Sequence, residues 1–158
     1  MTGPPEERLQ HALDVAYRYL GHRDRTVAEV RRRLEAEHVQ PPVLDEAVAE
    51  LERQGYLDDA RYARRFAEDR RTIDAWGAER IERRLLAVGV DPTLIAAALD
   101  ERGAGEELEA ALAVLRRRFA SAPSDDRDRE RALGLLVRKG YELELAYDAV
   151  RAFERDAA

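Results

Sequence analysis

The chain has 158 residues, 45% of them hydrophobic and 38% charged, which is enough for one ordinary core or for several small stacked cores. The absence of cysteine excludes a disulfide framework, a thiolate metal site and a cysteine nucleophile. The net charge of −6 argues against a protein that binds nucleic acid by bulk electrostatics alone. Neither a signal peptide nor a long apolar run is present, so we expect a cytoplasmic protein.

Hydrophobic spacing predicts three helices in the first third of the chain. The first covers about residues 6–20. Thr26 and Glu29 then have the spacing of a capping box that opens the second helix. Pro41 and Pro42 suit the first turn of the third helix.

The same arrangement recurs in the middle of the chain. A helix is expected over residues 59–71, and Gly77 precedes a second helix that contains Ile81 and Leu85. Asp91 and Pro92 then form an N-cap and first-turn pair for a third.

A third triplet follows, beginning with a helix over residues 106–119. Self-comparison at a shift of about 51 residues aligns its second helix and following turn with those of the first two triplets, and it aligns His38 with Gly89 and Gly140 at the helix ends. We therefore predict an all-α fold of three tandem tri-helical, helix-turn-helix-like repeats that form an elongated curved body. The expected repeat boundaries are residues 6–54, 55–102 and 105–156.

The stretch YLDD at residues 56–59 spells the string with which polymerases of the reverse-transcriptase type hold catalytic metals. Here Asp58 and Asp59 follow Gly55 at the start of a predicted helix, and the strand platform of such a polymerase is missing. A carboxylate at that place accepts backbone N–H groups, so we interpret both residues as helix caps.

Other signals of catalysis are equally weak. His11, His22 and His38 lie in three different segments without metal-ligand spacing, and no phosphate loop, nucleophile elbow or paired-histidine zinc motif occurs. We expect no enzymatic activity, no cofactor and no metal.

Arginine supplies nearly all of the positive charge, and Lys139 is the one lysine. Two pairs of arginines occupy equivalent places in the first and second repeats, and four more crowd the helix between them. These candidate residues are Arg32, Arg33, Arg83 and Arg84, with Arg64, Arg65, Arg70 and Arg71. In the third repeat Gly134 and Leu135 replace the pair, so the feature fades.

Two interpretations of these arginines remain open. They form either a solubilising face, ion-paired to Glu29, Glu35, Glu68 and Glu79, or a basic ridge that meets an acidic protein groove or a phosphate backbone. Trp76, the one tryptophan, either plugs the junction between repeats or projects as an interface anchor.

Residues 55–90, GYLDDARYARRFAEDRRTIDAWGAERIERRLLAVGV, resemble the central signature of the RecX family, regulators of the RecA recombinase. The resemblance extends upstream through YLGHRDRTVAEVRRRL (19–34) and downstream through RALGLLVRKGYELELAYDAVRAF (131–153). The matching motif positions are Gly55, Leu57, Asp58, Asp59, Phe66, Gly77, Ile81, Leu85 and Gly89.

The resemblance implies a modular helical protein that binds within the groove of RecA filaments and limits filament growth, ATP hydrolysis and strand exchange in DNA repair, recombination and the SOS response. It implies no catalytic residues. Many members carry a basic, glycine-containing stretch where this chain has Thr72–Trp76, which favours the filament protein over DNA as the main partner. Single- or double-stranded DNA would be bound weakly, and we expect a monomer.

Two rival functions fit the same sequence. A DNA-binding helix-turn-helix-type module that acts without RecA would bind bare DNA with steep salt dependence. A helical-repeat scaffold for an unrelated partner would ignore both DNA and recombinase filaments.

Overall fold

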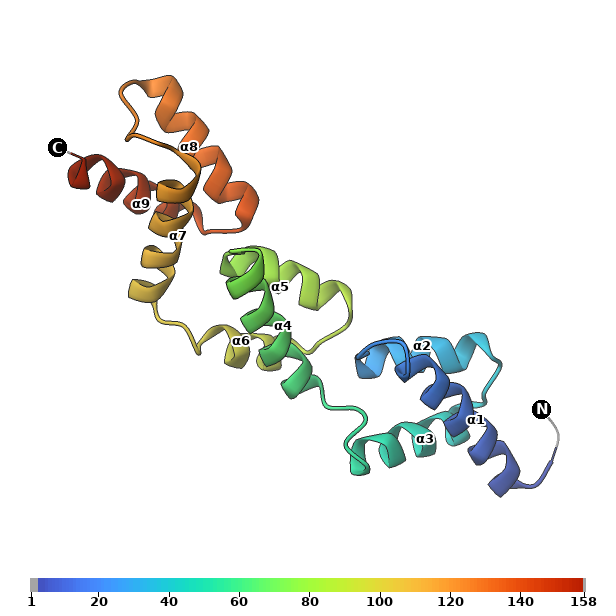
Figure 1. Ribbon diagram of the computed structural model, residues 1–158. Coiled ribbons are helices and arrows are strands. Elements are labelled where there is room, and N and C mark those ends of the chain that lie inside the picture. Colours follow the sequence, from blue (N-terminus) through green and yellow to red (C-terminus); the bar gives the residue numbers. More distant parts are fainter. Residues whose placement is uncertain (1–2, 158) are drawn as a thin grey trace. The chain divides into compact units, whose positions relative to one another are not determined.

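A computed structural model describes residues 3–157, which contain nine α-helices and no strand (Figure 1). The helices are α1 (Pro5–Leu20), α2 (Val27–Ala36), α3 (Pro41–Arg53), α4 (Asp59–Ile73), α5 (Ala78–Ala87), α6 (Pro92–Leu99), α7 (Ala104–Arg118), α8 (Asp126–Lys139) and α9 (Leu143–Asp156). They begin and end close to the expected positions, and the all-helical prediction is confirmed.

The chain divides into two compact units. The first combines the residues up to Ala63 with Leu85–Ile95, and the second combines Arg64–Arg84 with the residues from Ala96 onward. Each unit therefore contains one complete helix triplet, α1–α3 or α7–α9, and a share of α4–α6. The residue boundaries expected for the three repeats stay a prediction.

A small hydrophobic core holds α1, α2 and α3 together, and Figure 1 shows these three helices as one group. Its most deeply buried members are Ala12, Ala16, Val30, Leu34, Ala47 and Leu51. They recur every three or four residues on each helix, so each helix buries one stripe and leaves its charged face in water.

The second complete triplet has its own core, built from α7, α8 and α9. Leu115, Leu136 and Ala149 are fully buried there. Tyr141 is 1% exposed, and its hydroxyl donates a hydrogen bond of 2.9 Å to the carbonyl of Ala75. This bond satisfies a polar group that burial would otherwise penalise.

The expected helix starts are confirmed by their hydrogen bonds. Thr26 and Glu29 form the reciprocal capping box of α2. The carboxylate of Asp58 accepts the N–H of Arg61 at 3.0 Å and so caps α4.

The expectation that Asp59 also caps its own helix is wrong. Asp59 is the first residue of α4, and its carboxylate accepts the N–H of Val27, the first residue of α2, at 3.0 Å. A side chain at that position points away from the amides of its own helix, so it satisfies an open amide of another one.

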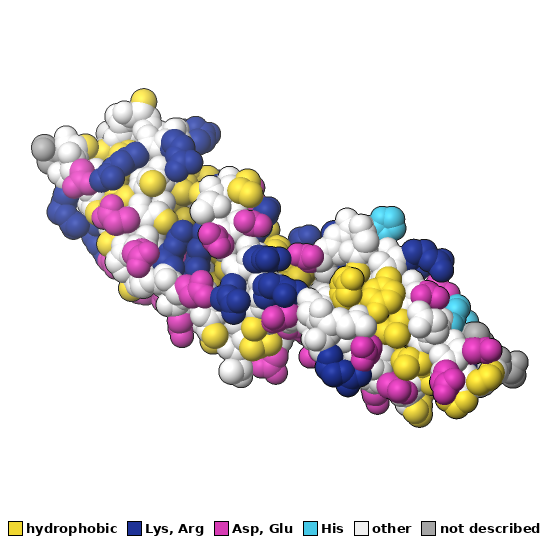
Figure 2. Space-filling view, turned by 60° about the horizontal axis from the view of Figure 1, so that its bottom comes forward, with side chains coloured by type: hydrophobic (Ala, Val, Ile, Leu, Met, Phe, Trp, Pro, Cys, Tyr) yellow, Lys and Arg dark blue, Asp and Glu magenta, His cyan; other side chains and the backbone are white. Residues whose placement is uncertain are grey.

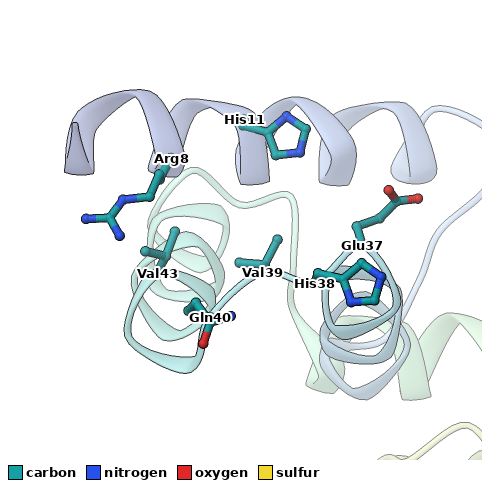
Figure 3. A pocket seen from close by; sticks show the side chains of 7 residues that line it. All are labelled: Arg8, His11, Glu37, His38, Val39, Gln40 and Val43. Atoms are coloured by element: carbon teal, nitrogen blue, oxygen red, sulfur yellow. The ribbon is translucent and has the colours of Figure 1, made fainter. Parts of the chain in front are cut away.

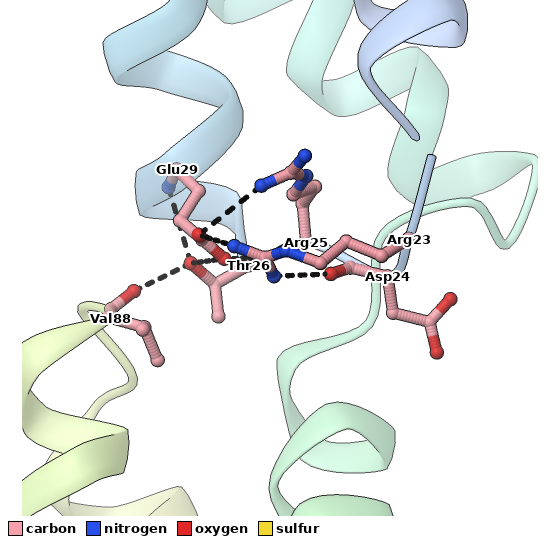
Figure 4. A network of polar contacts seen from close by, with 6 residues as sticks. All are labelled: Arg23, Asp24, Arg25, Thr26, Glu29 and Val88. Atoms are coloured by element: carbon pink, nitrogen blue, oxygen red, sulfur yellow. Dashed lines mark hydrogen bonds and ion pairs between the residues drawn. The ribbon is translucent and has the colours of Figure 1, made fainter. Parts of the chain in front are cut away.

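The start of α2 meets the turn after α5 in what we call the first joint (Figure 4). The Thr26 hydroxyl donates to the carbonyl of Val88 at 2.6 Å. The bond from the Val27 N–H to Asp59 also belongs to this joint. Gly89 follows with φ of +84°, and a Cβ added there would lie 2.3 Å from the Cβ of Ala28. Only glycine fits this close approach.

A second joint connects the start of α5 with the turn between α8 and α9. The N–H of Gly77 donates to the carbonyl of Lys139 at 2.8 Å, and the carboxylate of Glu107 accepts the N–H of Ala78 at 3.2 Å. A Cβ on Gly77 would lie 2.5 Å from the carbonyl of Gly140. Two backbone features of the joints correspond at a spacing of 51 residues: the carbonyls of Val88 and Lys139 accept a hydrogen bond, and the N–H groups of Val27 and Ala78 donate to a carboxylate.

His38 occupies the helix-ending position that glycine takes in the other triplets. Its φ is +63°, against +84° at Gly89 and +100° at Gly140, so the predicted equivalence is confirmed. The left-handed region disfavours any residue with a Cβ.

We expect His38→Gly to stabilise the first unit by about 0.5–1 kcal/mol, because it removes this backbone penalty. His38→Ala is the matched control, since it keeps the Cβ and should give no gain. Urea unfolding of both variants measures the difference. A loss of stability in His38→Gly would show that the imidazole makes contacts worth more than the strain.

Candidate functional site

Charges of both signs are interspersed over the molecular face displayed in Figure 2. Within residues 3–157, no helix is long and apolar enough to cross a membrane, and no group of three His, Asp or Glu side chains is placed to hold a metal ion. The arginines, the tryptophan and the surface hollows are the remaining candidates for a functional site.

Three of the predicted arginines are exposed and have no partner in the described part of the chain. Arg32 lies on α2, and Arg83 and Arg84 lie on α5. Arg32 and Arg83 project from the side of their helix opposite the buried stripe, and Arg84 lies beside the stripe of α5. Arg65 on α4 is also exposed.

Two other predicted arginines make surface ion pairs. Arg33 lies 3.4 Å from Glu37, the residue that caps the end of α2. Arg64 lies 3.9 Å from Glu101. Exposed pairs of this kind contribute about 0.2–1 kcal/mol, so a stronger anionic partner can replace the carboxylate.

The last two predicted arginines are engaged inside the second unit. Arg70 pairs with Asp74, and a terminal nitrogen of Arg71 donates to the carbonyl of Leu99 at 3.0 Å. Burial lowers the pKa of Arg71, and the neighbouring charge of Arg102 lowers it further. Both arginines therefore act first as structural ties.

Trp76 is half-buried in the connection between α4 and α5. Its ring meets Phe66 edge-on at 6.1 Å, and the guanidinium groups of Arg80 and Arg70 lie 4.2 Å and 5.9 Å from its centre. The preceding Ala75 has φ of +56°, which turns the chain sharply at this point. The ring packs against α4 and α5 while part of its surface stays accessible, and its role as a junction plug or an interface anchor stays a prediction.

The solubilising interpretation expected the carboxylate of Glu29 to be a surface partner for the arginines of α2. The structure shows otherwise. Glu29 is 8% exposed, and its carboxylate accepts the N–H of Thr26 at 3.1 Å and binds Arg23 at 2.8 Å (Figure 4). The bond from Arg23 raises the pKa of that guanidinium. Glu29 thus holds the first joint together.

Burial raises the pKa of Asp59, and the charges of Glu52 and Glu29 add to this effect, while the N–H of Val27 opposes it. A carboxyl whose pKa is raised on folding is destabilising when ionised. The free energy of unfolding therefore rises as the pH falls from above the raised pKa towards the pKa of Asp59 in the unfolded chain.

We expect Asp59→Asn to remove this pH dependence, because an amide oxygen still accepts the Val27 N–H without a charge. Urea unfolding at several pH values between about 7 and 4 measures it. The stability of the native protein should improve relative to the variant as the pH falls. A relative decline would mean that the ionised hydrogen bond outweighs burial.

A small hollow of about 20 Å³ brings together two histidines that the sequence separates (Figure 3). His11 on α1 and His38 after α2 line it, with Arg8 and Glu37 of opposite charge at its edge. Although three potential ligands line the hollow, they do not form a group that could hold a metal ion. Its mixed charges favour neither anions nor cations.

Three family models match the chain in succession. They are described as the first, second and third three-helix domains of RecX and cover residues 12–51, 58–99 and 105–150. The predicted three tandem repeats are thereby confirmed.

Curated relatives agree with the family models. The chain is 37% identical over 134 residues to the "Regulatory protein RecX" of Trichlorobacter lovleyi, covering 82% of this chain and 87% of that protein. It is 30% identical over 150 residues to the protein of the same name from Amycolatopsis mediterranei, covering 94% and 86%. The crystal structure of RecX from Lactobacillus salivarius shares the fold, with a TM-score of 0.83 at 17% identity, covering 95% of this chain and 99% of that chain.

Proposed function

This chain belongs to the RecX family of regulatory proteins, and on that premise we propose that it regulates the RecA recombinase, mainly as an inhibitor. The protein would bind in the groove of the RecA–DNA filament and limit filament growth, ATP hydrolysis and strand exchange. It would act in the cytoplasm, by binding and without catalysis.

The exposed arginines at equivalent places of α2 and α5 carry this proposal. Arg32, Arg83 and Arg84 have no internal partner to give up among the described residues, so binding does not first have to break an ion pair. A guanidinium group also matches carboxylate or phosphate with two parallel hydrogen bonds. A filament groove offers many such acceptors in a regular series.

The repeated architecture supports a filament as the partner. The two joints fix the start of α2 against the turn after α5, and the start of α5 against the turn after α8. Each joint lies within one compact unit, so it orders the recognition helix of that unit before binding and lowers the conformational entropy lost on association. Several modest contacts then add through effective concentration, which favours a filament over a single protomer.

Co-sedimentation with preassembled filaments tests the proposal. We expect the protein to pellet with RecA on single-stranded DNA and to remain in solution with RecA alone. The proposal fails if the protein stays in the supernatant while filaments pellet. Failure to pellet with single-stranded DNA in the absence of RecA would not affect it.

A further inference from the structure

A groove of about 390 Å³ lies between α8 and α9, and we call it the α8–α9 groove. Leu133 on α8 and Tyr147 and Val150 on α9 give it an apolar lining, and charged side chains of both helices form its rim. All of these residues belong to the second unit.

The apolar surface of the groove continues towards the turn between the two helices. Val137 lies one turn after Leu133 on α8, and Leu143 lies one turn before Tyr147 on α9, so each pair shares a face. The exposed fractions of Val137, Leu143 and Tyr147 are 42%, 50% and 44%. An exposed apolar patch that spans two helices is typical of an interaction site, whereas single exposed apolar residues are not.

The first triplet has charged residues where the third has this apolar surface. Two shifts of 51 residues align the buried Val48 of α3 with the buried Val150 of α9, so the two faces are equivalent. Three surface positions differ in polarity between them, namely Leu133 against Arg31, Val137 against Glu35, and Tyr147 against Asp45.

Arg31 and Asp45 form an ion pair of 2.8 Å across the face of the first triplet. The helices of that triplet pack with charges at these positions, so the fold does not require apolar residues there. Packing within the third triplet therefore does not account for the exposed Tyr147 and Val137.

The rim of the α8–α9 groove offers little net charge to a strongly charged ligand. Arg129 pairs with Asp126 at 2.6 Å and with Glu154 across the groove at 2.7 Å. Arg151 is paired within α9, and Glu130 is exposed without a partner in the part of the chain that the structure describes. Such a rim suits a partner surface that is apolar at its centre and carries both signs of charge at its edge.

We propose that two copies of this chain associate through the α8–α9 groove. In a two-fold symmetric contact the same surface of both copies meets face to face. With the two-fold axis along the groove, α8 of one copy lies over α9 of the other. Leu133 then covers Tyr147 of the partner subunit, and Glu130 faces Arg151 of the partner subunit.

The charges of the groove are compatible with this symmetry. The pair between Arg129 and Glu154 shows that these stretches of α8 and α9 lie at the same level, and Glu130 and Arg151 belong to the same stretches. The symmetric contact therefore brings opposite charges together twice, and no like charges are forced together. It needs no recombinase, so it stands or falls separately from the function proposed above.

The patch is small, so the association should be weak. A stable interface buries about 20–30 residues on each side, far more than the residues of this groove. We expect a dissociation constant on the order of 100 µM. The monomer expected from the sequence is then the form at low concentration.

Sedimentation equilibrium of the full chain between about 5 and 500 µM measures this association. We expect the mean mass to rise with concentration from 18.0 kDa, the mass of one chain, towards that of two chains.

The combination of Leu133→Arg with Tyr147→Asp gives the third triplet the ion pair that Arg31 and Asp45 form in the first. The net charge does not change, and the first triplet shows that the fold accommodates such a pair. We expect the dissociation constant to rise at least ~10-fold, because the centre of the contact loses its apolar side chains.

The matched control combines Ile73→Arg with Leu86→Asp. Both residues are exposed and apolar, and both lie outside the groove, so the same two charges are introduced elsewhere. We expect the dissociation constant to change less than ~3-fold. Urea unfolding verifies that each variant keeps its stability.

Charge reversal tests the partner and the symmetry together. Glu130→Arg alone places two arginines opposite each other, so we expect the dissociation constant to rise at least ~3-fold. Adding Arg151→Glu recreates opposite charges across the contact and should return the constant to within ~2-fold of the native value.

Three results would overturn the proposal. They are the mass of one chain at every concentration, equal losses in the groove variant and its control, and failure of Arg151→Glu to restore association in Glu130→Arg. The first would leave the apolar face to a different protein.

Discussion

Gly140→Ala should destabilise the protein by about 3 kcal/mol or more, whereas Gly55→Ala should cost about 1 kcal/mol. Both glycines have positive φ, +100° and +81°, so both substitutions place a Cβ in the disfavoured region. They differ in the space around them. A Cβ on Gly140 would lie 2.2 Å from the Cβ and 2.7 Å from the N of Arg80, while nothing lies within 4 Å at Gly55.

The clash at Gly140 involves backbone, so a change of side-chain rotamer cannot relieve it. Either α5 moves away or the turn after α8 is distorted, and both break the second joint. Urea unfolding of the two variants, with the slope of each transition compared, measures the cost. Equal losses for Gly140→Ala and Gly55→Ala would show that the second joint is not formed in solution.

Replacing Arg32, Arg83 and Arg84 by alanine should weaken inhibition of the recombinase. We expect the protein concentration that gives half inhibition to rise by about 10- to 100-fold. A charge-assisted hydrogen bond contributes about 1.5–3 kcal/mol when its acceptor is well placed. Some of that is lost to screening at an exposed surface. The fold should not change, because all three side chains are exposed and none has a partner among the described residues.

A matched triple variant controls for net charge. Arg53, Arg116 and Arg151 are exposed arginines paired with neighbouring acids, and their replacement by alanine changes the charge equally. Half-inhibition concentrations from RecA ATP hydrolysis compare the two variants. Equal inhibition by the native protein and the first variant would remove its three arginines from the binding site.

The helices were predictable because their signals are local. The Thr26–Glu29 box, Pro41 in the first turn and the Asp91 cap each act within one turn of the chain, and the structure has all three. Left-handed helix ends also repeat at a fixed spacing, which made His38 recognisable as the partner of two glycines.

The joints were not predictable in this way. Asp59 and Glu107 both accept the first amide of a helix in another triplet, yet they are 48 residues apart and fall outside the 51-residue register. Their partners are distant in sequence, so no local pattern identifies them. By contrast, Arg23 and Arg25 lie only six and four residues before Glu29, so their engagement of its carboxylate was a local signal that sequence reasoning missed.

Sequence reasoning missed the basic stripe of α8, formed by Arg127, Arg131 and Arg138, although its helical spacing is readable. The third repeat has Gly134 and Leu135 at the positions equivalent to Arg83 and Arg84, so alignment of the repeats does not reveal this stripe. The helical spacing of Arg127, Arg131 and Arg138 on one face was the available signal. Phe119 lies beside this stripe from the end of the neighbouring helix α7. Helical spacing alone does not predict that proximity.

The most direct test of the proposed function is the single-strand-dependent ATP hydrolysis of RecA during titration with this protein. If the protein binds in the filament groove, we expect strong inhibition at substoichiometric ratios, because one bound molecule would affect several subunits. Unchanged hydrolysis at an equimolar ratio, whatever the affinity for bare DNA, would contradict the account.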